Sequence, residues 1–148
     1  MRKMLTQPVA KPHWPDGIRP VAFTDVDPRL LHGLLDLAFP GRVADFVTWY
    51  GNLTTDAEFD PALCMPAVAA EGEVAGFVQC WNTGFVKDLA VSPVHRRKGV
   101  GAALMQRAFA LFAERGHDHV DLKVQLADLP AYRLYTRLGM EEAADGPA

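Results

Sequence analysis

The chain has 148 residues, the size of one ordinary domain built around a single hydrophobic core. Its net charge of −3 argues against a nucleic-acid-binding protein, because such proteins usually carry a basic excess. No window of 18 consecutive apolar residues occurs and no apolar segment follows Arg2 and Lys3, so we expect neither a membrane span nor a signal peptide. Cys64 and Cys80 lack metal-binding and disulfide spacing, so we expect reduced thiols, no metal site and a cytoplasmic location.

Residues 1–17 contain three prolines and no sustained hydrophobic period. We therefore expect an N-terminal arm that either packs on the domain or stays mobile, ahead of a single domain over residues 18–148. Residues 18–24 are short and β-prone. Asp27 and Pro28 then supply the cap and the first position of a helix, so a strand leads into a helix here.

Two helices and a loop are expected between that strand and residue 64. The apolar face of the first helix consists of leucines at positions 30, 31, 34 and 35. The second helix is expected over about residues 42–52, and its apolar face is formed by Val43, Phe46, Val47 and Tyr50. Residues 53–64 have the composition of a loop.

From Met65 the hydrophobic period changes from helical to extended. Three β-prone segments, at residues 66–70, 74–81 and 85–91, are separated by short turn signals and predict an antiparallel meander. Residues 119–126 predict one further strand. The order of strands and helices predicts a mixed α+β fold, in which a sheet carries helices on its faces.

Two more helices are predicted in the second half of the chain. The first has an apolar face made of Val100, Leu104, Ala108, Leu111 and Phe112. The second is capped by Asp128, ends at Gly139, and has an inward face made of Ala131, Leu134, Tyr135 and Leu138.

The turn between residue 91 and the first of these helices combines positive charge with two glycines. Arg96, Arg97 and Lys98 precede Gly99 and Gly101, and the first N–H groups of a helix have no internal partner. Such a turn favours phosphate, although a solvated basic turn is an alternative. A Walker A loop is excluded because the lysine precedes its glycine, and a Rossmann fingerprint is excluded by leucine at position 104.

Two motifs carry a resemblance to a known family. Arg-x-x-Gly-x-Gly at residues 96–101 follows the strand text DLAVSP and precedes an amphipathic helix. It resembles the acyl-CoA loop of the GNAT N-acetyltransferase superfamily. DLPAYRLYTRLGM at residues 128–140 is similar to the superfamily's Asn-x-x-Ala-x-x-Leu-Tyr-x-x-x-Gly-Phe. The resemblance extends from about Ile18 to Met140, although the first half matches only in its order of elements.

The resemblance implies a mostly antiparallel sheet with helices on both faces, splayed between its fourth and fifth strands at residues 85–91 and 119–126. Acetyl-CoA would lie in that opening, with its diphosphate on the backbone N–H groups of residues 97–102. The residues expected to contact the cofactor are Leu89, Ala90, Val91, Arg96, Arg97, Lys98, Gly99, Val100, Gly101, Ala102, Asp128 and Ala131. Asp128 departs from the family's asparagine, which puts one of these contacts in doubt.

The resemblance also implies acetyl transfer from acetyl-CoA to a primary amine by direct attack in a ternary complex. Tyr135 matches the tyrosine that stands near the CoA sulfur, where a phenol can donate a proton to the leaving thiolate; plain core packing is the alternative. Asp88 is the candidate base, because its alternation partners Val86 and Ala90 are apolar and enclosure raises a carboxyl pKa. It equally fits an acid that anchors the acceptor or pairs with a neighbouring cation.

The expected acceptor is a small-molecule amine or a peptide N-terminus, with no nucleic acid and no membrane as partner. Its candidate lining is Trp49, Tyr50, Trp81, Asn82 and Phe85. A non-catalytic acyl-CoA-binding sensor or interaction module on the same fold is the alternative function. Only nine residues follow Gly139, too few for the family's final hairpin. We therefore expect the N-terminal arm or a second subunit, in a homodimer, to cover the strand at 119–126.

Overall fold

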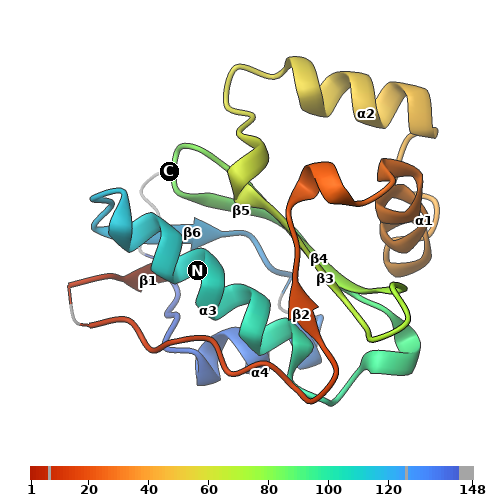
Figure 1. Cartoon of the computed structure of the whole chain (residues 1–148). Helices are drawn as coiled ribbons and strands as arrows, with labels where there is room; N and C mark the ends of the chain where they lie inside the picture. Colours follow the sequence, from red (N-terminus) through yellow and green to blue (C-terminus); the bar gives the residue numbers. More distant parts are fainter. Residues whose placement is uncertain (7, 126, 144–148) are drawn as a thin grey trace.

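The computed structural model describes residues 1–6, 8–125 and 127–143. Its six-stranded sheet has the order β1-β6-β5-β4-β3-β2 (Figure 1). The strands are β1 (Arg2–Met4), β2 (Arg19–Pro20), β3 (Cys64–Val68), β4 (Val74–Trp81), β5 (Phe85–Val91) and β6 (His119–Leu122). The helices are α1 (Pro28–Ala38), α2 (Phe46–Thr55), α3 (Val100–Glu114) and α4 (Leu129–Arg137), with 3-10 turns η1 (Phe23–Asp25), η2 (Pro61–Leu63) and η3 (Pro93–His95). No helix of the described residues is long and apolar enough to cross a membrane.

The predicted mixed fold and its splayed sheet are confirmed. Strands β3, β4 and β5 form the expected antiparallel meander, whereas β5 and β6 are parallel. The β5–β6 pairing consists of Phe85 with Asp121 and Val86 with Leu122. From residue 87 onward, β5 has no β6 partner within the described chain, so the two strands separate. The predicted strand at 119–126 is shorter in the structure, and its residue 126 lies outside the described residues, as do residues 144–148.

The N-terminal arm contributes a strand that the sequence analysis missed. Arg2 to Met4 pair antiparallel with β6, and the Arg2 guanidinium contacts the Asp121 carboxylate at 2.8 Å. Arg2 also forms an antiparallel bridge with Glu141, just after α4. The splay therefore lies between the fifth and sixth strands in chain order. Because the arm covers the β6 edge, a bare edge no longer argues for a homodimer.

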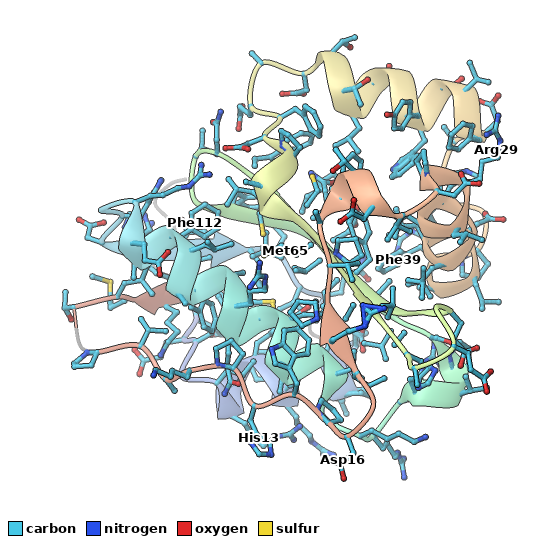
Figure 2. All side chains as sticks on the ribbon, viewed as in Figure 1. His13, Asp16, Arg29, Phe39, Met65 and Phe112 are labelled. Carbon is cyan, nitrogen blue, oxygen red and sulfur yellow. The ribbon has the colours of Figure 1, made fainter. Side chains whose placement is uncertain are left out.

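Two hydrophobic clusters lie on opposite faces of the sheet. The first packs α3 and α4 against one face and includes Phe112 of α3 and Met65 of β3 (Figure 2). The second packs α1 and α2 against the other face, around Phe77. We call these the α3/α4 face and the α1/α2 face. Gly76 of β4 allows α3 to pack closely, because a Cβ there would lie 2.9 Å from Leu104 and from Val100.

Two details of the predicted helix faces are wrong. Leu30 of α1 is 53% exposed and Val47 of α2 is 76% exposed, although both were placed on apolar faces. Helix α2 begins at Phe46 rather than near residue 42, and its buried residue is Leu53. The three other leucines predicted on the apolar face of α1, at positions 31, 34 and 35, are buried. Val43, which was expected on the apolar face of the second helix, lies before the first residue of α2.

Deleting residues 1–5 should lower the melting temperature and cause concentration-dependent association. The reason is that the deletion removes β1 and leaves the β6 edge with unpaired backbone groups. Differential scanning fluorimetry and sedimentation velocity would measure the two effects. Asp121→Asn is the control, because it keeps β1 in place and weakens the partly exposed pairs of Asp121 with Arg2 and His119, which should cost under ~1 kcal/mol. A truncated chain that stays monomeric and equally stable would contradict the assignment.

Candidate active site

The turn between β5 and α3 has the backbone conformation of an anion site. Arg97 has a φ of 62° and Gly99, the N-cap of α3, has a φ of 91°. The first amide of α3 bonded within the helix is that of Ala103, which donates to the Gly99 carbonyl at 3.0 Å. No side chain of the described residues caps the helix, so within this part of the chain the amides of residues 100–102 have no helical or capping partner. A left-handed backbone conformation is uncommon and strained for a residue such as arginine, and strained residues of this kind occur often in functional turns.

The side chains of this turn divide into two groups. Arg96, Arg97 and Lys98 are exposed, and the Arg96 Nε donates to the Val91 carbonyl at 3.4 Å, which holds that side chain over the end of β5. His95 instead points into the protein, where its Nε2 lies 3.2 Å from the Glu73 carboxylate and its side chain is 12% exposed. The three cations therefore surround the open amides, whereas the histidine packs the loop.

Three elements converge beside this turn. A Cβ placed on Gly101 would lie 3.4 Å from Leu134 of α4, 3.5 Å from Val91 and 3.7 Å from Leu89 of β5. These are ordinary van der Waals distances, so the start of α3 lies directly against β5 and α4 at the point where β5 has lost its β6 neighbour. The structure thus brings together cofactor candidates from β5 and α3, which sequence reasoning had linked only through the family motif.

Asp128 and Ala131 lie at the start of α4. The Asp128 carboxylate accepts a hydrogen bond from the Ala131 amide at 3.3 Å, so the predicted cap is confirmed. Ala131 is half-buried and packs against the cluster on the α3/α4 face. The carboxylate already has one backbone donor, and an ionised carboxylate has no proton to offer a ligand.

A β-bulge in β5 decides where Asp88 points. Gln79 pairs with Asp88 but the next residue of β4 pairs with Val86, so Lys87 has no partner across the β4–β5 ladder. Val86 accordingly packs in the cluster on the α3/α4 face, and Ala90 packs in the one on the α1/α2 face. The expectation that Val86, Asp88 and Ala90 share one face is therefore wrong for Val86. Asp88 lies on the α1/α2 face with Ala90.

Asp88 is partly enclosed, as predicted. Its side chain is 23% exposed, and burial raises the pKa of its carboxyl above the usual range. The Lys87 ammonium, 3.7 Å away, opposes this rise in pKa, but that lysine side chain is 50% exposed and the pair is long. The carboxylate is thus a better proton acceptor than an ordinary surface aspartate.

Tyr135 lies on the α3/α4 face of the site. It is 8% exposed, and burial, followed by the negative charges of Asp128 and Asp88, raises its pKa to about 12. Across the described residues its hydroxyl has no hydrogen-bond partner, which argues against the alternative of a core tyrosine with a satisfied hydroxyl. The phenol stays protonated at neutral pH and can donate a hydrogen bond.

The candidate acceptor lining lies mostly on the α1/α2 face. Trp49, Tyr50 and Trp81 are half-buried and pack against that cluster, whereas Asn82 is exposed. Phe85 is half-buried at the start of β5. Sequence reasoning missed one polar residue here, which is Gln79. It was detectable as the only uncharged polar side chain in the apolar run VAGFVQCW of residues 74–81.

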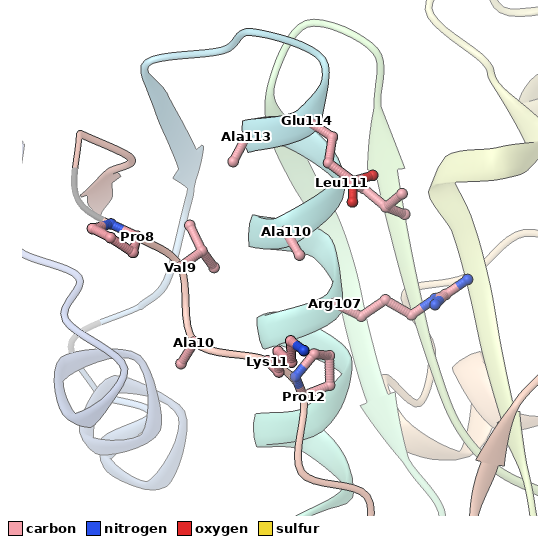
Figure 3. Close-up of a pocket in the computed structure, with 10 residues that line it drawn as sticks. All are labelled: Pro8, Val9, Ala10, Lys11, Pro12, Arg107, Ala110, Leu111, Ala113 and Glu114. Atoms are coloured by element: carbon pink, nitrogen blue, oxygen red, sulfur yellow. The ribbon is translucent and has the colours of Figure 1, made fainter.

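A cavity of about 570 Å³ lies elsewhere, between the N-terminal arm and α3 (Figure 3). Its lining consists of Pro8, Val9, Ala10, Lys11, Pro12, Arg107, Ala110, Leu111, Ala113 and Glu114. None of the predicted site residues lines it, so this cavity lies apart from the candidate site at the splayed edge of β5. In the described ranges, no group of three His, Cys, Asp or Glu side chains is arranged to hold a metal ion.

Residues 31–140 match the model of the acetyltransferase (GNAT) family. The chain belongs to this family. A GCN5-related N-acetyltransferase from Sphaerobacter thermophilus has a crystal structure that superposes with a TM-score of 0.83 at 30% identity, over 95% of this chain and 46% of that one. The GNAT fold is therefore shown by both sequence and structure.

Other GNAT proteins match part of the chain. The mycothiol acetyltransferase of Clavibacter sepedonicus is 40% identical over 92 residues, which is 60% of this chain and 30% of that protein. Arabidopsis thaliana Naa50, solved with the bisubstrate analogue CoA-Ac-MVNAL, shares the fold with a TM-score of 0.66 at 19% identity, over 83% of this chain and 82% of that one. The chain spans about a third of the mycothiol enzyme and about half of the Sphaerobacter protein.

Replacing Gly99 by valine should weaken acetyl-CoA binding about tenfold or more, or ~1.4 kcal/mol. A β-branched residue is strained at a φ of 91°, so the turn would move and its open amides with it. Isothermal titration calorimetry measures the affinity. Gly116→Val is the matched control, because Gly116 has a φ of 83° and open space around it at the far end of α3. Equal affinity in a folded Gly99→Val protein would refute the assignment of this turn.

Asp88→Asn should raise the melting temperature at neutral pH. A carboxyl whose pKa is raised by folding favours the native state only while it is protonated, so the ionised wild-type group destabilises the fold. The stability difference should vanish below about pH 3.8, where the unfolded group is also neutral, and grow as pH rises through the raised pKa. Thermal melts across this range check the prediction. A less stable Asn variant at pH 7 would show that the carboxylate is well paired.

Proposed function

We propose that this protein transfers an acetyl group from acetyl-CoA to a primary amine by direct attack in a ternary complex. The observation that carries the proposal is the juxtaposition of the splayed β5 edge with the open amides at the start of α3. The helix dipole and three exposed cations favour a diphosphate there. Membership of the GNAT family and the CoA-containing complex of the related fold support the same co-substrate.

In this proposal the cofactor lies across residues 89–91 and 96–102. The unpaired edge of β5 beyond Val86 offers backbone groups to the pantetheine amides, as it would to an added strand. The diphosphate would accept from the amides of residues 100–102, with Arg96, Arg97 and Lys98 around it. A backbone N–H near Leu89 would stabilise the oxyanion of the tetrahedral intermediate.

The two candidate catalytic side chains occupy opposite faces of β5. The amine would approach from the α1/α2 face, attack the thioester carbon and pass its proton to the Asp88 carboxylate, directly or through water. The carbon–sulfur bond then breaks on the α3/α4 face, where the neutral Tyr135 hydroxyl would donate to the thiolate. Each proton thus has its own partner, and neither step requires a metal ion.

The acceptor we propose is a small-molecule amine or a peptide N-terminus. One relative is named a mycothiol acetyltransferase, and the related fold of Naa50 is solved with the bisubstrate analogue CoA-Ac-MVNAL, so both acceptor classes are represented. The carboxylate of Asp88 suits a cationic amine that must lose a proton before attack. A cytoplasmic location remains part of the proposal, in keeping with two buried free cysteines. The arm occupies the β6 edge that a second subunit was expected to cover, so no homodimer is proposed.

A non-catalytic acyl-CoA sensor is the second candidate. The observation in its favour is Asp128, which stands where the family has asparagine and whose carboxylate accepts from the Ala131 amide. A sensor would be stabilised by acetyl-CoA and would never release CoA thiol. An enzyme would release thiol in the presence of an amine, so a thermal-shift screen followed by a thiol-release assay separates the two functions.

Tyr135→Phe should lower kcat about tenfold or more while acetyl-CoA affinity changes little. The substitution removes only the hydroxyl that we assign to the leaving thiolate, and Phe fills the same buried space. Thiol release gives kcat and calorimetry gives the affinity. Tyr132→Phe is the matched control, because that tyrosine is half-buried on the same helix and its hydroxyl donates to the Glu142 carboxylate at 3.2 Å. Unchanged turnover in Tyr135→Phe would remove the hydroxyl from the mechanism.

A further inference from the structure

Three side chains form a row across neighbouring strands on the α1/α2 face of the sheet. Cys64 of β3 pairs in register with Gln79 of β4, and Gln79 pairs with Asp88 of β5. Residues opposite one another in antiparallel strands point to the same face. The neighbours of Gln79 two positions away, Phe77 and Trp81, pack in the cluster on the α1/α2 face, which fixes the direction of the row.

Gln79 is a buried amide with an unused donor. The residue is 2% exposed, and its Nε2 has no hydrogen-bond partner within the described residues. An unpaired amide in the centre of a sheet costs folding free energy that an apolar residue of the same size would not. Such a residue is expected where a polar group has a functional partner.

Its burial decides between two functional partners. A side chain that is 2% exposed has almost no surface to offer an acceptor molecule. The other candidates are the members of its own row, and the Cys64 thiol is a weak acceptor. The Asp88 carboxylate remains, because it lies directly opposite and directly opposed residues have Cβ atoms about 4.5–5.5 Å apart.

We propose, resting on the proposed function above, that Gln79 is a positioning residue: its Nε2 donates to one oxygen of the Asp88 carboxylate and leaves the other oxygen for the acceptor amine. Three rotatable bonds let the glutamine amide reach the carboxylate by a rotamer change without backbone movement. Catalytic hydrogen bonds are often long before the substrates bind and tighten in the ternary complex. The bulge at Lys87 serves this pairing, because it turns Asp88 onto the face that holds Gln79.

The other groups that face Asp88 are known from the described residues. The Lys87 ammonium lies 3.7 Å from the Asp88 carboxylate on the same strand. The negative charge of Asp88 also contributes to the raised pKa of the Tyr135 phenol on α4. Cys64 lies beyond Gln79 on β3, with a pKa raised to about 12 by burial, so its thiol stays neutral. None of these groups is a buried neutral donor directly opposite the carboxylate, which is the place that Gln79 occupies.

The test is a ¹³C NMR titration of the Asp88 carboxyl in aspartate-labelled protein, assigned with Asp88→Asn, with acetyl-CoA present. Gln79→Met keeps the length and volume of the side chain and removes its donor. We expect the pKa of Asp88 to be higher in Gln79→Met than in the wild type, because a donor to the ionised form lowers a pKa. Gln106→Met, on α3 and outside the site, is the matched control and should leave that pKa unchanged.

Stability separates positioning from packing. Gln79→Met should melt at the wild-type temperature or above it, because it replaces a buried unpaired amide, while thiol release falls about tenfold. In an Asp88→Asn background the same substitution should have no further effect on the residual rate. If Gln79→Met does not fold, Gln79→Leu serves the same titration, because leucine also suits a buried position and has no hydrogen-bond donor.

An Asp88 titration curve that superposes on the wild-type curve in the folded Gln79 variants overturns this inference. The titration needs no turnover, so its outcome is independent of the proposed function. A wild-type protein that binds acetyl-CoA and never releases thiol would refute the enzyme and still report on Gln79. Conversely, loss of turnover in Asp88→Asn with an unmoved titration in Gln79→Met would leave the enzyme intact and remove the glutamine.

Discussion

The separation of β5 from β6 after Val86 is the constraint on which the rest of the structure depends. Beyond that residue, β5 is paired on one side only, and a strand edge that is left unpaired inside a protein needs a partner. The molecule covers its outermost edge with the N-terminal arm, yet leaves this inner edge open. Because this edge of β5 lies inside the sheet, a strand of another protein has no room to pair with it. A narrow, extended ligand can form backbone hydrogen bonds there instead.

The bulge at Lys87 gives the two faces of β5 different chemistry. It places Asp88 and Ala90 on the α1/α2 face, and Leu89 and Val91 on the opposite face beside Gly101. The site also concentrates polar groups that the fold leaves poorly satisfied, namely a buried carboxyl, a tyrosine hydroxyl and a glutamine amide. Each costs stability, and natural proteins accept such costs mainly at functional sites.

Local signals in the sequence predicted most of the fold. The meander followed from short turns, and α3 and α4 followed from helical periodicity and the Asp128 cap, because these patterns depend on neighbours in sequence. Strand β1 was missed because three residues carry no pattern of their own and are held by a partner more than 110 positions away. The sequence analysis placed Asp88 and Val86 on the same face of β5 because no residue pattern in the sequence reveals the bulge at Lys87 that separates them. The sequence predicted the position of the turn between β5 and α3. Whether a side chain caps the amides of α3 could be seen only in the structure.

The arm and the segment after α4 together cover the outer edge of the sheet. Met4 to Arg2 run along β6, the Met1 carbonyl accepts from the Leu122 amide at 3.0 Å, and Arg2 exchanges two backbone hydrogen bonds with Glu141. The arm therefore holds β6 from its outer side, and the segment after α4 holds the arm. Strand β6, which forms one wall of the opening, is thus paired on both of its sides, whereas β5 beyond Val86 has no β6 partner in the described chain. The arm belongs to the site's architecture, because it completes the pairing of the strand that forms this wall.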